Sequence, residues 1–411
     1  MGAPPMSTPT PPATNPPPLS PTRRQKLLWR SIAALLIVAV IAVAAGFAWQ
    51  HREYPLALLR GQVNFVGGSS HATPLHLPPG FTAEVYASEM SAPRFLTFGP
   101  DGVLYVAESA AGRVTALPMD RATGKAARHV TVASGLQHPT SLAFMGDILY
   151  VGETSRVTRM TIGSDMSASG QQRIITDLPN SGIHITRTVL IGPDGMLYVS
   201  IGSSCNVCDE SDPHRASVWQ YHPDGSGGRQ YARGLRNAVG MAVNPVTHDI
   251  WVTNNGRDLM GDNTPPDTIY SLQQGANYGW PRCHAGNIID PDMGEHGDCN
   301  GVAQPLAKLP AHSAPLGLAF YTASAFPARY HGLFVAFHGS WNRSAPTGYK
   351  VVFIPLDSAG HVSGPPQDFA TGWLRDGSTS GRPVGLAVGP DGALYVSDDA
   401  AGLIYRISYS A

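Results

Sequence analysis

A short motif recurs six times along the chain and constrains the fold more than any other feature. Each copy is a turn rich in Pro, Asp and Gly that leads into an apolar strand, because Pro presets φ and Gly supplies a positive φ. The clear copies are GPDGVLYVAES from Gly99, GPDGMLYVSIGS from Gly192 and GPDGALYVSDD from Gly389. The weaker copies are MGDILYVGE from Met145, NPVTHDIWVTNN from Asn244 and YHGLFVAFHGS from Tyr330.

A second apolar strand precedes each copy, as in FLTFGP, SLAFMG, TVLIGP, GMAVNP, GLAFYT and GLAVGP. The copies follow one another at about the 40–50 residues of a four-stranded propeller blade, with longer loops after the fourth and fifth. Such a unit cannot bury its apolar face alone and must stack on its neighbours around an axis. We therefore predict an all-β fold, a six-bladed β-propeller over residues 73–411.

The N-terminal part has a different composition. Residues 1–28 form a proline-rich tail that ends in basic residues, and residues 29–50 are almost wholly apolar between Trp29 and Trp49. This run is long enough to span a bilayer, and the basic residues before it predict a cytoplasmic tail. We predict a transmembrane anchor at 29–50 and a linker at 51–72. A cleavable secretory signal, cut near Ala42 to Ala48, stays open as the alternative.

Charge and motifs exclude several function classes. The chain has 28 Lys plus Arg against 29 Asp plus Glu, a balance that gives no basic surface for nucleic acid. No G-x-G-x-x-G opens a helix, so a nicotinamide cofactor has no support. A small neutral substrate fits this composition better.

Four cysteines suggest disulfides in an oxidising compartment. The local pairs Cys205 with Cys208 and Cys283 with Cys299 are the simplest of three connectivities. Asp209 follows C-N-V-C where a c-type haem site needs His. We expect structural staples rather than a redox or zinc site.

Ligand sites of propellers lie where loops from all blades converge at one end of the channel. Functional residues should therefore occupy the same position in each repeat, which we call the phase of the repeat. Residues of this phase precede the inner strand of the second, third, fourth and sixth units. They are His138, His184, Arg236 with Asn237, and Arg382.

The sequence resembles the pyrroloquinoline-quinone-dependent soluble aldose dehydrogenases, the family of glucose and sorbosone dehydrogenases. The segments that carry the resemblance are HITRTVLIGPDGMLYVSIG, GLRNAVGMAVNP, DTIYSLQQGANYGWP, HGSWNR and GRPVGLAVGPDGALYVSDD. They span most of residues 75–408, and HGSWNR with Trp341 is closest to the sorbosone-type branch.

The resemblance implies roles for the residues of this phase. His184 would be the general base that takes a hydroxyl proton while hydride leaves the adjacent carbon for the quinone. Arg236 would stabilise the charge that develops on the quinone, with Asn237 and His138 beside it. Arg382 would pair with a cofactor carboxylate.

Lys350 or Arg343 would do similar work to Arg382, which is to pair with a cofactor carboxylate. The chain departs from the family pattern at Thr188, where an Arg is frequent, and at Ala238-Val239, where Pro-Gln is usual.

The segment NNGRDLMGDNTPPD matches the family's calcium-bearing loop. The resemblance implies that the carbonyls of Gly256 and Arg257 bind the Ca²⁺ held with the quinone, and that Asp267 and Tyr278 bind a neighbouring structural ion. Asp258 and Asp262 add hard carboxylate oxygens nearby, as calcium requires.

We therefore expect an extracytoplasmic, membrane-tethered dehydrogenase that oxidises an aldose or sorbosone-like sugar. The propeller would face the periplasm, and electrons would pass to a quinone or cytochrome in the membrane. A calcium-dependent lactonase-like hydrolase is one alternative, and it requires carboxylates that converge from several blades. A non-catalytic binding propeller is another, and exposed aromatic patches on its top face without a histidine and arginine pair at the channel would favour it.

Overall fold

The computed structural model describes residues 64–65 and 74–410. The chain divides into two compact units, Met1–Arg52 and Glu53–Ala411, and the described residues belong to the second. The predicted tail and anchor lie outside the described residues, as does nearly all of the predicted linker. Within the part that is described, no helix is long and apolar enough to cross a membrane.

Six four-stranded antiparallel sheets form the blades within the described residues, and one three-stranded and two two-stranded sheets lie outside the blades. The innermost strands are β3 (Pro93–Phe98), β9 (Ser141–Met145), β13 (Arg187–Ile191), β17 (Ala238–Val243), β23 (Pro315–Tyr321) and β29 (Pro383–Val388). The second strands are β4 (Leu104–Glu108), β10 (Ile148–Glu153), β14 (Leu197–Ile201), β18 (Ile250–Asn254), β24 (Gly332–Phe337) and β30 (Leu394–Asp398).

The third and outer strands complete the blades. The third strands are β5 (Arg113–Leu117), β11 (Arg156–Ile162), β15 (Ser217–Tyr221), β19 (Asp267–Ser271), β25 (Lys350–Pro355) and β31 (Leu403–Tyr409). The outer strands are β8 (Val130–Ala133), β12 (Ala168–Ile175), β16 (Arg229–Arg233), β22 (Ala307–Leu309), β26 (Gln367–Ala370) and β2 (Phe81–Ala87).

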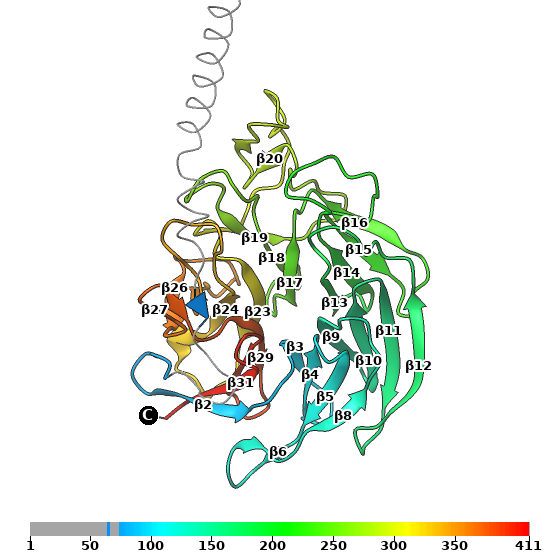
Figure 1. Cartoon of the computed structure of the whole chain (residues 1–411), viewed down its shortest axis with the longest axis vertical. Helices are drawn as coiled ribbons and strands as arrows, with labels where there is room; N and C mark the ends of the chain where they lie inside the picture. The colour runs from blue at the N-terminus through cyan, green and yellow to red at the C-terminus, as the bar shows by residue number, and fades with distance from the viewer. Residues whose placement is uncertain (1–63, 66–73, 411) are drawn as a thin grey trace, which may run out of the picture. The chain divides into compact units, whose positions relative to one another are not determined.

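The blades close into a ring about a central axis (Figure 1). Each innermost strand contacts the innermost strands of both neighbouring blades, and β29 of the sixth blade contacts β3 of the first. Strand β2 supplies the outer strand of the sixth blade by pairing with β31, so the two ends of the propeller meet in one sheet. The prediction of a six-bladed all-β propeller is confirmed.

The recurring motif is explained by a side-chain contact inside each clear turn. The Asp101 carboxylate accepts a hydrogen bond from the Val103 amide (3.0 Å) and another from the Tyr105 hydroxyl (2.9 Å). Asp194 with Tyr198 and Asp391 with Tyr395 repeat the hydroxyl contact at 2.9 and 3.1 Å. The turn therefore fixes the first residues of the second strand, which is buried along its whole length in β4, β14, β24 and β30.

Neighbouring blades are also joined by buried hydroxyl groups. Thr253 of β18 donates to the Leu316 carbonyl of the next blade (2.8 Å) and accepts from the Gly240 amide (2.8 Å). Ser200 and Ser397 occupy the same position in β14 and β30, and donate to the carbonyls that open the following blade. A side chain at this position thus satisfies backbone groups that the sheet ladders leave unpaired.

The loops at one end of the channel carry the long insertions. Between β19 and β22, a small hairpin of β20 (Cys283–His284) and β21 (Ile288–Ile289) projects from the fourth blade (Figure 1). The disulfides Cys205–Cys208 and Cys283–Cys299 confirm the two predicted local pairs. Both lie in loops at the end where the innermost strands begin.

Replacing Thr253 with Val should lower the free energy of unfolding by about 2–4 kcal/mol, because the isosteric side chain leaves one buried carbonyl and one buried amide without a partner. Chemical denaturation of the propeller measures this effect. The exposed Thr82, whose hydroxyl meets only the Ser408 hydroxyl (3.2 Å), provides the control T82V, which should cost about 0.5 kcal/mol or less. Equal effects of the two substitutions would contradict the proposed role of the buried hydroxyl.

Candidate active site at one end of the channel

Every blade places a cationic or imidazole side chain just ahead of, or at the start of, its innermost strand. The sequence analysis identified His138, His184, Arg236 and Arg382 in this phase, and the structure places all of them at the same end of the channel. The first and fifth blades complete the series with Arg94 and His312, which the sequence analysis missed. The same phase rule, applied to every unit, would have found both.

His184 is held through one ring nitrogen. Its Nδ1 lies 3.0 Å from the Ser203 carbonyl oxygen and 2.9 Å from the Ser203 hydroxyl. A carbonyl only accepts, so Nδ1 carries the hydrogen and the lone pair of the neutral ring is on Nε2. Ser203 is itself fully buried, and its amide donates to the Arg236 carbonyl (2.7 Å).

Two buried guanidinium groups form hydrogen bonds with the loop that carries His184. Arg187 and Arg215 both donate to the His184 carbonyl, at 3.2 and 3.0 Å. Among the described residues, no carboxylate lies within ion-pairing distance of either group. Burial, with the charges of Arg236, Arg215 and Arg187, lowers the pKa of His184 to about 3, so the imidazole is neutral at physiological pH.

Gly202 lies against His184, the predicted base, and only a glycine fits at this position. A Cβ at this position would lie 2.7 Å from the His184 Cβ and 2.4 Å from the Asn237 side-chain oxygen. His184 and Asn237 therefore flank the same point of the chain at the end of β14. The structure brings together the predicted base and the predicted cofactor-binding asparagine.

Arg236 is buried and oriented by four contacts. Its Nη2 forms an ion pair with Asp258 (2.7 Å), and its Nη1 donates to the Gly256 carbonyl (2.7 Å). Nε donates to the Asn206 carbonyl and Nη2 also donates to the Asn206 side-chain oxygen, both at 3.0 Å. Asn206 was not predicted from the sequence, because its role depends on contacts with a residue that is distant along the chain.

Arg382 has no carboxylate within ion-pairing distance among the residues described. Its Nε and Nη2 donate to the carbonyls of His338 (3.1 Å) and Gly339 (2.9 Å), and its guanidinium lies 5.6 Å above the Tyr349 ring. Burial lowers the pKa of Arg382, and the nearby Asp399 and Asp398 carboxylates offset this shift only in part. An anionic ligand group would offset it further.

Beside Arg382 lies a cluster that the sequence analysis did not identify. Asp399 pairs with Arg94 (2.7 Å) and with the His338 Nε2 (3.0 Å). Burial lowers the pKa of His338 to about 4 despite the nearby carboxylate. Asp258 and Asp399, which belong to different blades, are thus both engaged by arginine. The converging free carboxylates that a lactonase-like site requires are not found among the described residues at this end.

The predicted calcium loop runs between β18 and β19. Its Asp267 carboxylate is fully enclosed and accepts from the amides of Gly256 (2.8 Å) and Ala314 (3.0 Å). Burial raises the pKa of Asp267 to about 7. The Tyr278 hydroxyl lies elsewhere, where it donates to the Ser271 carbonyl (2.7 Å) and accepts from the Gln273 amide (2.9 Å).

Other predicted residues have partners of their own. The Arg257 side chain pairs with Asp290 and Asp292 of the insertion, and the Asp262 carboxylate accepts from the Ser344 amide (2.9 Å). Arg343 donates to the carbonyls of Asp262 and Ala311.

Lys350 pairs with Asp368 of β26 (2.5 Å), and His138 is exposed. The structure therefore does not place Lys350 against Arg382.

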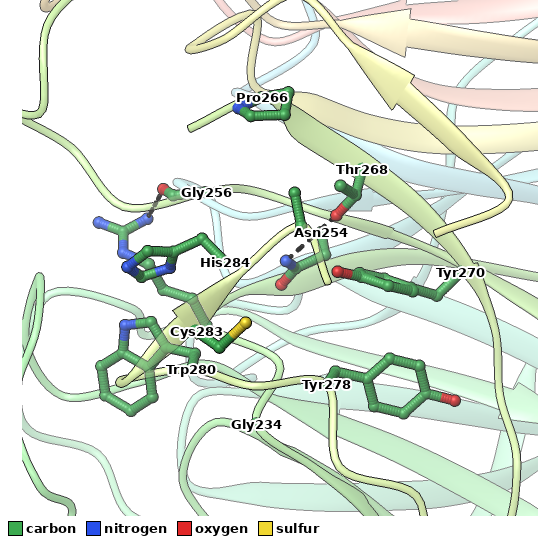
Figure 2. A pocket seen from close by; sticks show the side chains of 12 residues that line it. Gly234, Asn254, Gly256, Pro266, Thr268, Tyr270, Tyr278, Trp280, Cys283 and His284 are labelled. Atoms are coloured by element: carbon green, nitrogen blue, oxygen red, sulfur yellow. Dashed lines mark hydrogen bonds between the residues drawn. The ribbon is translucent and has the colours of Figure 1, made fainter. Parts of the chain in front are cut away.

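A small polar cavity of about 10 Å³ lies beneath Arg236 and Gly256, which is room for about one water molecule. Figure 2 shows Trp280 and His284 on one side of it and Asn254, Thr268 and Tyr270 on the other. The cavity is too small for an organic cofactor.

The fold and this site define a six-bladed β-propeller with an arginine-rich site and a neutral histidine at one end of its channel. The model of the TrAA12-like family matches residues 75–293 and 290–410. The chain belongs to this family. The resemblance to pyrroloquinoline-quinone-dependent sugar dehydrogenases is thereby confirmed at the level of the family.

Several curated proteins are similar along most of the chain. An uncharacterised protein of Borreliella burgdorferi is 30% identical over 355 residues, which cover 82% of this chain and 91% of that protein. The pyrroloquinoline quinone-dependent pyranose dehydrogenase of Coprinopsis cinerea is 27% identical and is covered over 54% of its length, with 81% of this chain aligned. The chain therefore spans about half of that relative.

Solved structures confirm the fold. The calcium structure of the Trichoderma reesei carbohydrate-active enzyme of family AA12 has a TM-score of 0.73 at 21% identity, with 84% of this chain and 100% of that chain covered. The holo form of the Coprinopsis cinerea pyranose dehydrogenase domain gives the same TM-score and coverage at 24% identity.

The low pKa of His184 predicts a pH-dependent loss of stability. The unfolded chain binds a proton on this residue below about pH 6.5 while the folded chain does not, so stability falls as the pH falls below that value. Between pH 7 and pH 5, the wild type should lose about 1–2 kcal/mol more unfolding free energy than H184Q, which cannot titrate there. Denaturation curves at each pH provide the measurement, and parallel pH profiles of the two proteins would contradict a depressed pKa.

Proposed function

We propose that the protein is a dehydrogenase that oxidises an aldose or related sugar with pyrroloquinoline quinone and Ca²⁺ bound at the channel end. The observation that carries the proposal is a neutral histidine with a free Nε2 beside Arg236, at the same end of the channel as Arg382. Relatives named as pyranose or sugar dehydrogenases support the substrate class.

The described residues fit a quinone that carries carboxylates. Arg382 is a buried cation without an anionic partner, and its planar guanidinium suits a carboxylate. Close to Arg236, the Asn342 side chain donates to Asp258 (2.9 Å), while its buried oxygen has no hydrogen-bond partner. An unpaired buried acceptor costs stability unless a donor or cation meets it, which is what a bound ligand would supply.

Oxygen atoms suited to calcium lie in the loop between β18 and β19. The Gly256 carbonyl already accepts from Arg236, and its second lone pair remains for a cation. We propose that the carbonyls of Gly256 and Arg257 hold Ca²⁺. The pairing of the Arg257 side chain with Asp290 fixes the direction of that part of the backbone. Asp267 and the backbone of Tyr278 remain our proposal for a second ion.

The proposed reaction assigns one proton transfer to this chain. His184 takes the hydroxyl proton of the sugar at Nε2 while Ser203 holds Nδ1, and the C–H bond of the same carbon breaks with transfer of its hydride. Pyrroloquinoline quinone, when bound, supplies the two-electron acceptor for that hydride. Arg236 is fixed beside the base and offers its charge to the oxygen that becomes negative. His184 is the residue on which turnover should depend.

The alternatives find less support. A binding platform without catalysis does not require a neutral imidazole anchored at Nδ1, and a hydrolase lacks free converging carboxylates among the residues described. The choice of an aldose over sorbosone as the substrate stays a proposal, as does the choice of a quinone or a cytochrome as the electron acceptor. A substrate panel and an acceptor panel would separate these possibilities.

Reconstitution of the chain with pyrroloquinoline quinone and Ca²⁺ tests the proposed function. Dye reduction over a panel of aldoses and sorbosone should require both additions and should stop when a chelator removes the metal. H184A should lower kcat by about 10²–10⁴-fold, because the proton acceptor is lost, while cofactor affinity changes little. The exposed His222, in the turn after β15, supplies the control H222A, which should behave as the wild type.

R382M should weaken cofactor affinity by about tenfold or more, because a charge-assisted hydrogen bond is lost. If saturating cofactor changes neither the absorbance nor the turnover of the wild type, the proposed function is overturned. Full turnover of H184A would overturn the role of the base but leave the dehydrogenase in place.

We further propose that residues 29–50 hold the propeller at the cytoplasmic membrane, facing the periplasm, which would bring it close to a membrane electron acceptor. Fractionation of cells that make the whole chain should find it in the membrane and resistant to carbonate extraction. Protease added to intact spheroplasts should digest the propeller. Release of a shortened chain into the soluble periplasm would show cleavage of this segment instead.

A further inference from the structure

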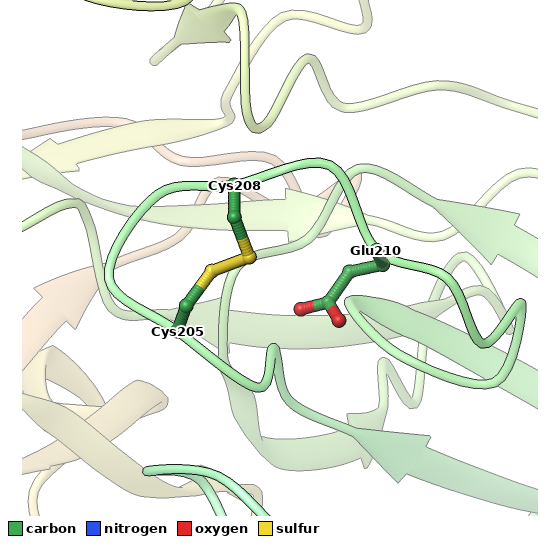
Figure 3. Close-up of side chains that lie close together, drawn as sticks. All are labelled: Cys205, Cys208 and Glu210. Atoms are coloured by element: carbon green, nitrogen blue, oxygen red, sulfur yellow. A yellow bond between two sulfur atoms is a disulfide. The ribbon is translucent and has the colours of Figure 1, made fainter. Parts of the chain in front are cut away.

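We propose that Asn206, held in the four-residue ring closed by the Cys205–Cys208 disulfide, is a positioning residue that sets the direction of the Arg236 guanidinium for its ligand. Figure 3 shows the ring as a tight loop beside Glu210. The inference rests on the proposed function, because the ligand of Arg236 is the proposed quinone. It adds a residue and a covalent constraint that act through Arg236.

Asn206 contacts three separate segments of the site. Its carbonyl accepts from the Arg236 Nε (3.0 Å) and from the indole of Trp280 (3.2 Å). Its side-chain oxygen accepts from the Arg236 Nη2 (3.0 Å) and from the Asp258 amide (2.8 Å), and its side-chain nitrogen donates to the Asp258 carbonyl (3.0 Å). One residue therefore contacts both Arg236 and the backbone of Asp258, the residue whose carboxylate pairs with Arg236.

These contacts fix the orientation of Arg236 and not only its position. The Asp258 carboxylate alone would leave the guanidinium free to rotate about a single ion pair. Asn206 binds it at Nε and at Nη2, so two donors on one edge of the fork are occupied and its plane is set. The Nη1 group keeps one N–H beyond its contact with Gly256, and that direction is open for a ligand.

The disulfide ring that carries Asn206 is itself held in place by hydrogen bonds of the neighbouring residues. Ser204 and Glu210 close the base of the loop, where the carboxylate accepts from the Ser204 amide (2.6 Å) and hydroxyl (2.8 Å). The Ser203 hydroxyl, which contacts His184, donates to the Cys205 carbonyl (2.6 Å). The ring thus lies between the residue that anchors the base and the residue that orients the arginine.

Reduction of this disulfide should therefore loosen the site. A dithiol reductant would transfer two electrons and two protons, so that the Cys205–Cys208 bond breaks, each sulfur gains a hydrogen, and the reductant closes a disulfide of its own. Both cysteines of the ring are partly exposed, whereas in the second disulfide Cys283 is fully buried and Cys299 is partly exposed. A reductant can therefore reach either sulfur of the ring but only one sulfur of the second disulfide.

The test is the binding of pyrroloquinoline quinone to the Ca²⁺-loaded chain, followed by absorbance without a sugar. N206A should weaken the cofactor by about tenfold, because three side-chain hydrogen bonds of a charged network are lost. C205S/C208S, which releases the whole ring, should weaken it at least as much, and treatment of the wild type with dithiothreitol should reproduce that loss. Thermal unfolding, measured in parallel, separates this effect from a loss of fold.

Two controls match these variants. Asn244 is a buried loop asparagine at the opposite end of the blades, where it contacts Gly360 (2.9 Å) and the Val246 amide (2.9 Å). N244A should lower the melting temperature and leave cofactor affinity unchanged. C283S/C299S keeps only the Cys205–Cys208 disulfide, so any further loss of cofactor affinity that dithiothreitol causes in this variant belongs to the ring.

A double-mutant cycle shows whether Asn206 acts through Arg236. R236K keeps the charge but loses the fork, so N206A should cost less than about threefold in that background. An equal loss in both backgrounds, or unchanged affinity in N206A and in C205S/C208S, would overturn the inference. Absence of cofactor binding in the wild type would overturn the proposed function instead, and the two failures are therefore distinct.

Discussion

The fold depends on the packing of apolar sheet faces between neighbouring blades. A four-stranded meander with two apolar faces has no stable form in water, and the second strand is buried along its whole length in four of the six blades. The hydroxyls of Thr253, Ser200 and Ser397 add direction to that packing, because each reaches a backbone carbonyl of the next blade. The ring closes where β29 of the sixth blade contacts β3 of the first, and β2 joins the two ends of the propeller in one sheet.

This packing also decides where chemistry can occur. The turns between the innermost and second strands occupy one end of every blade, and in three blades an Asp and Tyr pair in this turn fixes the strand. The other end carries the loops that precede the innermost strands and the loops that follow the second strands. His184, Arg236 and Arg382 all lie at that end although they belong to different blades, because the ring repeats one phase of the chain around one axis.

The repeat made the fold and the end of the channel predictable, and the phase of the repeat made His184, Arg236, Asn237 and Arg382 predictable. It could not show which way a side chain points within a strand or loop. Lys350 opens β25 but turns toward Asp368 of the outer strand, a choice set by strand alternation and register. The role of Asn206 was hidden because it depends on contacts between loops, and periodicity carries no information about such contacts.

Burial and the charges of neighbouring arginines together keep the base of the site neutral. Arg187, Arg215 and Arg382 donate to backbone carbonyls, and no carboxylate forms an ion pair with them among the described residues. Burial opposes protonation of His184 most strongly, and the charges of Arg236, Arg215 and Arg187 add to this effect. Buried positive charges at this end of the channel also favour an anionic ligand. One arrangement of buried arginines therefore serves both the base and the proposed cofactor with its carboxylates.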